Sequence, residues 1–330
     1  MNILLSPDSF KGTLTSSEVC DIIESALRNR IPDCNVIKLP AADGGEGLCS
    51  SFANFIDGEW ISAESKDPFG LSLRAEYYML KSSAAVIETA SCAGLPLAGD
   101  RADPTVTTTA GVGMLIRDAV NRGAKRIVLG LGGSATNDGG CGAAAAAGIK
   151  FYDKSGKSFV PVGRTLKDIA SIDYSGLDSA LSGVSISAMC DVDNPLLGET
   201  GAANVFGPQK GANVAMIARL DAGLKHLAEV SGKAKLASMP SAGAAGGMGF
   251  GMMAFFNCPL QMGIDGLLDI IDFESILAGA DLVLTGEGRI DPQSMRGKTV
   301  IGVARRASKC GVPTICLLYT SDAADDLIGV

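Results

Sequence analysis

Five short apolar segments of this chain each run directly into a polar loop that carries glycines or carboxylates. The loops are DSFKG (8–12), ADGGEG (42–47), GGSATNDGG (132–140), DVDNPLLG (191–198) and GEGRID (286–291). In open α/β sheets, ligands bind outside the carboxyl ends of the strands, where such loops converge. Because only 19% of the residues are charged, five loops of this kind predict one shared site.

Helix and strand patterns between these loops favour an α/β fold. Thr15 and Glu18 match the T-x-x-E capping box, which predicts that a helix begins after Thr15. Residues 107–123 are expected to form another helix, and 125–133 a buried strand that enters the third loop. Between residues 59 and 96, strand-like segments follow one another without a helix, which predicts an antiparallel or mixed sheet. A length of 330 residues predicts one large or two ordinary domains.

Charge patterning argues against nucleic acid and membrane as partners. The net charge is −8, with no basic stripe, whereas phosphate backbones are held by clustered Lys and Arg. Residues 236–264 carry no charge and are long enough to suggest a membrane span. Six glycines and two prolines interrupt them, so we expect a glycine loop followed by a buried segment, MMAFFNC.

Cysteine and histidine usage narrows the chemistry. The nine cysteines are scattered and include no C-x-x-C pair, which favours reduced thiols in a cytoplasm over a zinc site or a disulfide framework. The amino terminus has no cationic lead and does not match a signal peptide. The single histidine, His226, lies in a helical pattern. A catalytic base is therefore expected to be a carboxylate or a lysine.

The segment GLGGSATNDGG permits several interpretations. Gly130, Gly132 and Ala135 satisfy the dinucleotide fingerprint G-x-G-x-x-G/A, although the acidic residue expected after the next strand is only loosely matched. A Walker loop is not matched around Lys298, because Pro292 stands where its first glycine belongs. A non-Walker phosphate cradle is the third possibility, since glycine amides and a helix N-terminus bind anions. A plain strand–helix turn, capped by Asn and Asp, also stays open.

Phosphoryl transfer needs cations near the phosphates, correct positioning and often a carboxylate near the accepting hydroxyl. Lys11 and Lys298 could meet phosphate oxygens, with Lys210 as a weaker third candidate. Arg289 could bind a substrate carboxylate bidentately. Mg²⁺ favours a few carboxylates together with water and substrate oxygens. The carboxylates in the loops are Asp43, Glu46, Asp138, Asp191 and Asp193.

Seven segments of the chain are distinctive: SPDSFKGTLTSSEV, LPAADGGEG, GLGGSATNDGG, CDVDNPLLG, FGPQKGA, GAAGGMGFG and TGEGRIDPQSMRGKTVIGVA. In this order they resemble the signature blocks of the bacterial glycerate kinase family, of the glycerate 2-kinase type without a Walker motif. The resemblance runs from residue 2 to about residue 315. It implies an ATP-dependent, Mg²⁺-assisted kinase that phosphorylates D-glycerate, most often to 2-phosphoglycerate and in some members to 3-phosphoglycerate.

The resemblance also implies a domain organisation. The expected fold is α/β, with a Rossmann-like parallel-sheet domain, a second α/β domain inserted into it, and the active site in the cleft. We expect residues 1–62 with 280–315 to form the first domain and 63–279 the second. Residues 316–330 include CLLYTSDAADD, which resembles a translated sequencing adapter. They are expected to be non-native, with part of the first domain missing.

The placement of these loops after strands motivates a hypothesis about the role of each site residue. Asp8 or Asp191 is expected to accept the proton of the glycerate hydroxyl, while Lys11 and Lys298 neutralise phosphate oxygens. Substrate is expected to contact Ser9, Arg289 and Asp291, and Mg²⁺ to contact Asp43, Glu46, Asp138 and Asp193. The glycine loops 132–140 and 243–251 are expected to wrap the nucleotide through Gly132, Gly133, Ser134, Thr136, Asn137, Gly246 and Gly247.

Two other functions compete with this interpretation. A nicotinamide-dependent oxidoreductase would use the Gly130 fingerprint and would bind NADH. A two-domain binding protein without chemistry would close on a small acid, but it leaves the lysines and carboxylates of the loops without a role. The sequence leaves the oligomeric state and the phosphorylated hydroxyl open.

Overall fold

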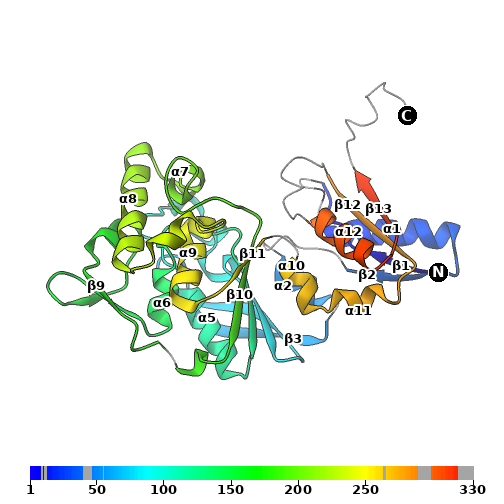
Figure 1. Ribbon diagram of the computed structural model, residues 1–330, viewed down its shortest axis with the longest axis horizontal. Coiled ribbons are helices and arrows are strands. Elements are labelled where there is room, and N and C mark those ends of the chain that lie inside the picture. The colour runs from blue at the N-terminus through cyan, green and yellow to red at the C-terminus, as the bar shows by residue number, and fades with distance from the viewer. Residues whose placement is uncertain are drawn as a thin grey trace. The chain divides into compact units, whose positions relative to one another are not determined.

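The computed structural model describes residues 1–8, 10, 13–39, 47–54, 56–177, 179–262, 265–288 and 299–318 (Figure 1). Contacts within the chain divide it into two compact units. Unit 1 comprises residues 1–43, 54–56 and 262–330, and unit 2 comprises 44–53 and 57–261. Unit 1 is therefore assembled from segments far apart in the sequence.

Unit 1 is built on a parallel sheet of four strands in the order β13-β12-β1-β2. The strands are β1 (Asn2–Leu5), β2 (Asn35–Lys38), β12 (Leu282–Glu287) and β13 (Thr314–Leu318). The two central strands come from distant parts of the sequence, β1 from near its beginning and β12 from after residue 280. At the start of this pair, Asn2 N donates to Asp281 Oδ2 at 2.7 Å.

Helix α1 (Ser16–Arg30) connects β1 to β2 and begins where the sequence predicts. Glu18 N donates to Thr15 Oγ1 at 3.2 Å, and Thr15 N donates to Glu18 Oε2 at 2.8 Å, which completes the capping box. Cys20 of α1 packs with Ile3 and Leu5 of β1. The helix therefore covers one face of the sheet with its apolar side.

Helix α12 (Thr299–Lys309) connects β12 to β13, and α10 (Asp265–Ile270) and α11 (Phe273–Leu277) precede β12. Val303 of α12 is completely buried. Arg306 donates to Asp265 Oδ1 at 3.2 Å and to Glu274 Oε1 at 2.8 Å. One guanidinium thus joins α12 to both α10 and α11.

Unit 2 is built on a mixed sheet of six strands in the order β11-β10-β6-β5-β4-β3. The strands are β3 (Gly58–Lys66), β4 (Ser72–Leu80), β5 (Ala84–Glu88), β6 (Arg126–Gly130), β10 (Ser185–Cys190) and β11 (Leu260–Met262). The pairs β3–β4 and β4–β5 are antiparallel, whereas β5–β6 and β6–β10 are parallel. The mixed sheet predicted after residue 59 is therefore confirmed.

Helices and a small second sheet complete unit 2. The helices are α2 (Leu48–Ala53), α3 (Ala90–Ala93), α4 (Leu95–Ala98), α5 (Ala110–Asn121), α6 (Cys141–Ala146), α7 (Ala202–Phe206), α8 (Val214–Val230) and α9 (Ala244–Phe256). Strands β7 (Lys150–Tyr152), β8 (Ser158–Phe159) and β9 (Ser171–Asp173) form the small sheet. Short 3₁₀ turns connect several elements; one of them, η4 (Pro208–Lys210), follows α7. Buried side chains of α5 pack on the large sheet, and those of α8 and α9 form a neighbouring core.

The glycine-rich segment before MMAFFNC is more helical than we expected. Only its start departs from helical geometry, at Ala245, Gly246 and Gly247, and α9 then continues to Phe256. Gly249 and Gly251 lie within this helix, and a Cβ on either would approach Ser241 O to 2.1 Å or Gly139 O to 2.4 Å. The prediction of a loop holds for residues 241–247 and was wrong from Met248 onward, where Gly249 and Gly251 allow close packing instead of breaking the helix.

The domain boundaries proposed from the sequence stay a prediction. Strand β3 runs without a break across the expected boundary between residues 62 and 63. Of the expected non-native tail, residues 316–318 belong to β13, and residues 319–330 lie outside the described residues. The origin of the tail likewise stays a prediction.

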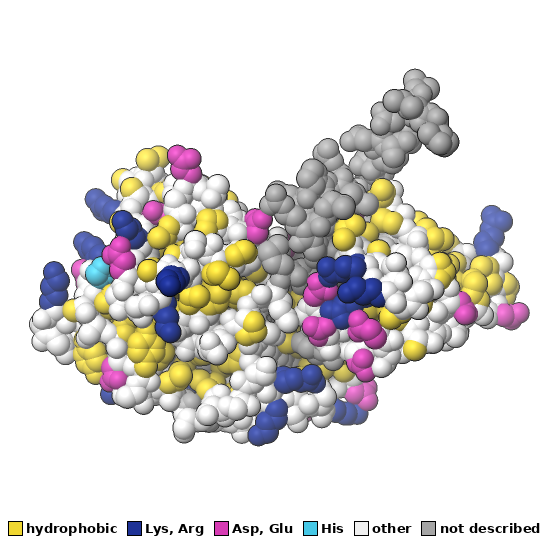
Figure 2. Space-filling model, in the orientation of Figure 1, with side chains coloured by type: hydrophobic (Ala, Val, Ile, Leu, Met, Phe, Trp, Pro, Cys, Tyr) yellow, Lys and Arg dark blue, Asp and Glu magenta, His cyan; other side chains and the backbone are white. Residues whose placement is uncertain are grey.

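Surface charge and helix length bear on the expected partners. On the face shown in Figure 2, basic side chains are scattered or lie next to acidic ones. Among the described residues, every helix is too short or too polar to cross a membrane.

Candidate functional site

The glycine loop between β6 and α6 is packed tightly into unit 2. Gly133, Gly139 and Gly140 have φ values of +69°, +62° and +76°, a region that favours glycine. A Cβ on Gly139 would lie 2.4 Å from Leu227 Cδ2, and one on Gly140 would lie 3.1 Å from Gly251 Cα. These glycines therefore let the loop turn sharply against α8 and α9.

Asp138 faces the interior of this loop. Its carboxylate accepts hydrogen bonds from Thr109 N (2.8 Å), Thr109 Oγ1 (2.9 Å), Gly140 N (3.0 Å) and Gly142 N (3.1 Å). The residue is completely buried, and burial raises the pKa of this carboxyl, against the opposing effect of the hydrogen bonds. Four protein donors around the carboxylate leave it as a cap for the turn, so the structure argues against the predicted role of Asp138 as a Mg²⁺ ligand.

Lys210 brings a buried positive charge to the loop. It ends the η4 turn and is only 2% exposed. Its Nζ donates to Ser134 Oγ at 2.9 Å and to Thr136 O at 2.8 Å. Burial lowers the pKa of Lys210 to about 7, and the charge of Asp138 acts in the opposite direction. From the sequence, Lys210 was a weaker candidate than Lys11 and Lys298 for contact with phosphate oxygens. Its position in the chain does not show that it contacts this loop.

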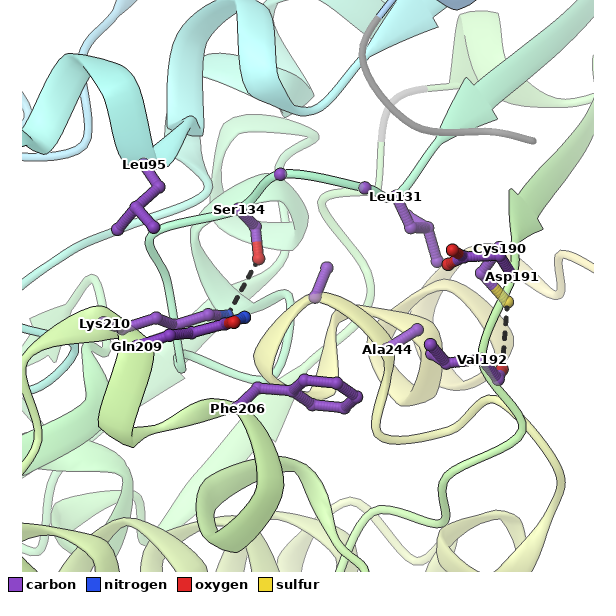
Figure 3. Close-up of a pocket in the computed structure, with 13 residues that line it drawn as sticks. Leu95, Leu131, Ser134, Cys190, Asp191, Val192, Phe206, Gln209, Lys210 and Ala244 are labelled. Carbon is purple, nitrogen blue, oxygen red and sulfur yellow. Dashed lines mark hydrogen bonds between the residues drawn. The ribbon is translucent and has the colours of Figure 1, made fainter. Parts of the chain in front are cut away.

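A cavity of about 370 Å³ lies beside Lys210 and Ser134. Gly132 and Gly133 line it at the end of β6, and Asp191 lines it at the end of β10. Figure 3 shows Lys210, Gln209 and Ser134 on one side of the cavity and Asp191 with Cys190 on the other. The lining between them is largely apolar, with Leu131, Val192, Phe206, Ala244 and Ala245. The cavity thus has a cationic side and an acidic side.

The irregular start of α9 packs against the same loop. Ala245, Gly246 and Gly247 have φ values of +51°, +67° and +84°, and a Cβ on Gly246 would lie 1.9 Å from Thr136 O. Buried polar atoms without a hydrogen-bond partner, Thr136 Oγ1 and both side-chain polar atoms of Asn137, lie in this part of the loop. The predicted nucleotide-binding residues of unit 2 are therefore gathered in one region, with Gly246 and Gly247 in contact with the loop.

Unit 1 carries polar side chains where β1 and β12 end. Asp8 N donates to Gly286 O at 2.8 Å, and Asp8 and Glu287 are 8% and 5% exposed. The register pairs Leu5 with Leu284, so alternation along the strands places Asp8 and Glu287 on the same face of the sheet. The sequence analysis named Asp8 and missed Glu287, although Glu287 stands in the GEGRID loop at the end of a buried strand.

The remaining predicted residues are not brought together by the described part of the chain. Asp193 is described and exposed. Those that lie outside the described residues are Ser9, Lys11, Asp43, Glu46, Arg289, Asp291 and Lys298. Among the residues that the structure describes, no three His, Cys, Asp or Glu side chains gather closely enough to hold a metal ion.

The fold and the pocket define an α/β protein with a cavity at the carboxyl ends of parallel strands, where ligands usually bind in this class. Residues 3–326 match the model of the family described as "Glycerate kinase family". A glycerate kinase of Bacillus subtilis (strain 168) is 45% identical over 320 residues, covering 96% of this chain and 84% of that protein. A glycerate 2-kinase of Escherichia coli (strain K12) is 43% identical over 320 residues, with the same coverage, 96% and 84%.

A solved structure agrees with these relatives. The crystal structure from Salmonella typhimurium LT2 that carries the name glycerate kinase 2 is 40% identical. It superposes with a TM-score of 0.87 and covers 99% of this chain and 92% of that chain. The chain belongs to the glycerate kinase family, and with it to the phosphotransferases that use an alcohol group as acceptor. The predicted family and α/β fold class are thereby confirmed.

Proposed function

We propose that this enzyme transfers the γ-phosphoryl group of ATP to D-glycerate, with Mg²⁺, and releases 2-phosphoglycerate. Family membership establishes a glycerate kinase, and the nucleotide, the ion and the product are the proposal. The relative named glycerate 2-kinase supports the 2-position. Formation of 3-phosphoglycerate is the alternative outcome.

The observation that carries this proposal is the cavity in unit 2. It combines the glycine loop after β6 with Ser134, a buried cation and the carboxylate of Asp191. Bare loop amides and a cation are suited to phosphate oxygens, and a carboxylate near the accepting hydroxyl is suited to take its proton. A nucleotide held by Gly132, Gly133 and Ser134 fits this arrangement, whereas Thr136 and Asn137 are buried and do not line the cavity.

In the proposed mechanism, a carboxylate accepts the proton of the glycerate hydroxyl as the oxygen attacks the γ-phosphorus in line. Asp191 is the first candidate, because it is exposed and lines the cavity, and Asp8 is the second. Lys11 and Lys298 neutralise phosphate oxygens. Arg289 orients the glycerate carboxylate, with Ser9 and Asp291 as further contacts.

Mg²⁺ would neutralise charge on the phosphates when it is bound. Asp43, Glu46 and Asp193 are the proposed ligands. Asp138 is not included, because its carboxylate already accepts four hydrogen bonds from the protein. The described residues do not form a metal site by themselves. We therefore assign no step of the reaction to a particular protein–metal contact.

We also propose that the enzyme works in the cytoplasm. All nine cysteines are free thiols in the structure. Thiols of this number stay reduced most readily in a cytoplasmic environment.

The proposal is tested by a coupled assay with ATP and D-glycerate, in which phosphorus NMR identifies the product. We expect ADP and 2-phosphoglycerate in equal amounts, and a requirement for Mg²⁺. A phosphorus signal from 3-phosphoglycerate alone would correct the regiochemistry. Binding of NADH without any phosphoryl transfer would replace the proposal with the oxidoreductase interpretation of the Gly130 fingerprint.

A further inference from the structure

The buried amine of Lys210, which is positively charged when protonated, makes no ion pair with any carboxylate that the structure describes. Both hydrogen-bond acceptors of its Nζ, Ser134 Oγ and Thr136 O, are neutral oxygens. The charge of Asp138 acts on Lys210 at a distance, without a hydrogen bond between the two side chains. The Asp138 carboxylate accepts its four hydrogen bonds from other donors. Buried charges in proteins are normally paired, so a ligand is the natural source of the missing negative charge.

The geometry leaves one N–H of Lys210 for such a ligand. A lysine ammonium has three donors and no acceptor, and two of the three are used by Ser134 and Thr136. Lys210 lines the cavity together with Gly132 and Gly133, and Figure 3 shows its amino group beside Ser134 at the cavity wall. The two protein acceptors hold the ammonium in place, so it need not reorganise when a ligand enters.

We propose that Lys210 is an anion-binding residue of this enzyme, whose ammonium, held by Ser134 and Thr136, donates its remaining hydrogen to a substrate oxyanion. The oxyanion is either a phosphate of the nucleotide or the carboxylate of glycerate, which share the same recognition chemistry. The inference rests on the proposed function for these two ligands. It deepens the mechanism above by assigning to Lys210 a direct contact with the oxyanion, and by stating how its ammonium is held and titrates.

Anion binding should also be linked to proton uptake. In the free enzyme, burial holds the pKa of Lys210 at about 7, so at pH 8 much of this residue is neutral. A bound anion favours the ammonium form and raises the pKa. Among the described residues, the charged groups around Lys210 and its cavity are Asp138 in the loop, whose charge acts on Lys210, and Asp191 on the opposite side of the cavity. At pH 8 the complex therefore takes up a proton that the free enzyme lacks.

The experiment measures binding by calorimetry, separately for a non-hydrolysable ATP analogue and for D-glycerate, in two buffers of different ionisation enthalpy. Lys210→Met removes the charge, and Lys210→Arg keeps it permanently. Lys157→Met is the matched control, because Lys157 is exposed on the β7–β8 hairpin. Circular dichroism and a thermal melt establish that each variant folds.

We expect Lys210→Met to bind one of the two ligands about 10–100-fold more weakly, the effect of losing one charge-assisted hydrogen bond. The affected ligand identifies the source of the oxyanion. Proton uptake at pH 8 should be present in the wild type and absent in Lys210→Arg, whose guanidinium stays charged throughout. Lys157→Met should match the wild type in both measurements.

The inference is overturned if both ligands bind Lys210→Met as tightly as the wild type. If Lys210→Met does not fold, Lys210→Arg decides instead, because unchanged proton uptake in that variant also overturns it. These outcomes are separate from failure of the proposed function. In that case the wild-type enzyme would bind ligand without producing phosphoglycerate from ATP and D-glycerate.

Discussion

The ammonium of Lys210 donates to the hydroxyl of Ser134 at 2.9 Å, although the two residues stand 76 positions apart in the chain. The bond joins the η4 turn to the glycine loop after β6. Both residues line the same cavity. A change in the charge of Lys210 therefore changes the strength of its hydrogen bond to the loop. Stability and ligand binding are therefore expected to depend on the same side chain.

Lys210 should make the stability of the enzyme depend on pH. Its pKa is about 7 in the folded protein, against an ordinary value of 10.5. Between these values the unfolded chain binds a proton that the folded protein does not, so this residue's contribution to stability rises with pH from about 7 towards 10.5 and is smallest below 7. Urea denaturation from pH 6 to 9 should show the free energy of unfolding of the wild type rising relative to Lys210→Met. A constant difference would contradict the assigned cause.

Asp191→Asn should impair the chemical step. Loss of a general base typically costs about 10²–10⁴-fold in kcat, while an amide of the same shape should leave the KM for D-glycerate within a few-fold. Asp168→Asn, at an exposed carboxylate of unit 2 that does not line the cavity, is the comparison. A kcat within a few-fold of wild type for Asp191→Asn would remove it from the mechanism and turn attention to Asp8.

Asp138→Asn should damage folding more than metal dependence. An amide cannot accept all the hydrogen bonds from Thr109, Gly140 and Gly142 that the carboxylate accepts. Unsatisfied buried donors cost about 1–3 kcal/mol, which a chemical denaturation curve can measure. The Mg²⁺ concentration for half-maximal activity should stay the same. A large increase in it, without loss of stability, would restore Asp138 as a metal ligand.

Gly246→Ala should destabilise unit 2 and weaken ligand binding. The new Cβ would lie 1.9 Å from Thr136 O, at a φ of +67°. Gly123→Ala is a useful comparison, because Gly123 also has a positive φ, +96°, but open space around it. The backbone cost alone is about 1–3 kcal/mol, so thermal melts should show a larger loss for Gly246→Ala than for Gly123→Ala. Equal losses of thermal stability in the two variants would mean that the loop around Thr136 moves to accommodate the new Cβ without a loss of free energy.

Local patterns in the sequence were enough for much of the fold. The Thr15–Glu18 capping box and the alternation of β3 are written in neighbouring residues, so they could be predicted. The glycines of α9 misled the prediction, because a glycine that permits contact with Gly139 looks the same in sequence as one that ends a helix. The deciding neighbour lies in another segment of the chain.

In the site, too, features set by neighbouring residues could be predicted, and contacts between distant segments could not. The loop after β6 was predicted from its composition to belong to the site, and Ser134 and Asp191 do line one cavity. The direction of each side chain was not predictable: Asp138 turns inward to Thr109, 29 residues away. Lys210 was given too low a place among the candidate phosphate-binding residues, because its burial and its contact with Ser134 cannot be read from the sequence.

The pairing of β1 with β12 has a consequence for biosynthesis. Asn2 bonds to Asp281, 279 residues later, so the amino-terminal strand leaves the ribosome long before its central neighbour exists. At about 5–20 residues per second this delay is roughly 15–60 s. The segment 57–261 of unit 2 emerges in full during that interval. Strand β1 is thus translated before segment 57–261 but gains its central neighbour β12 only after that segment is complete.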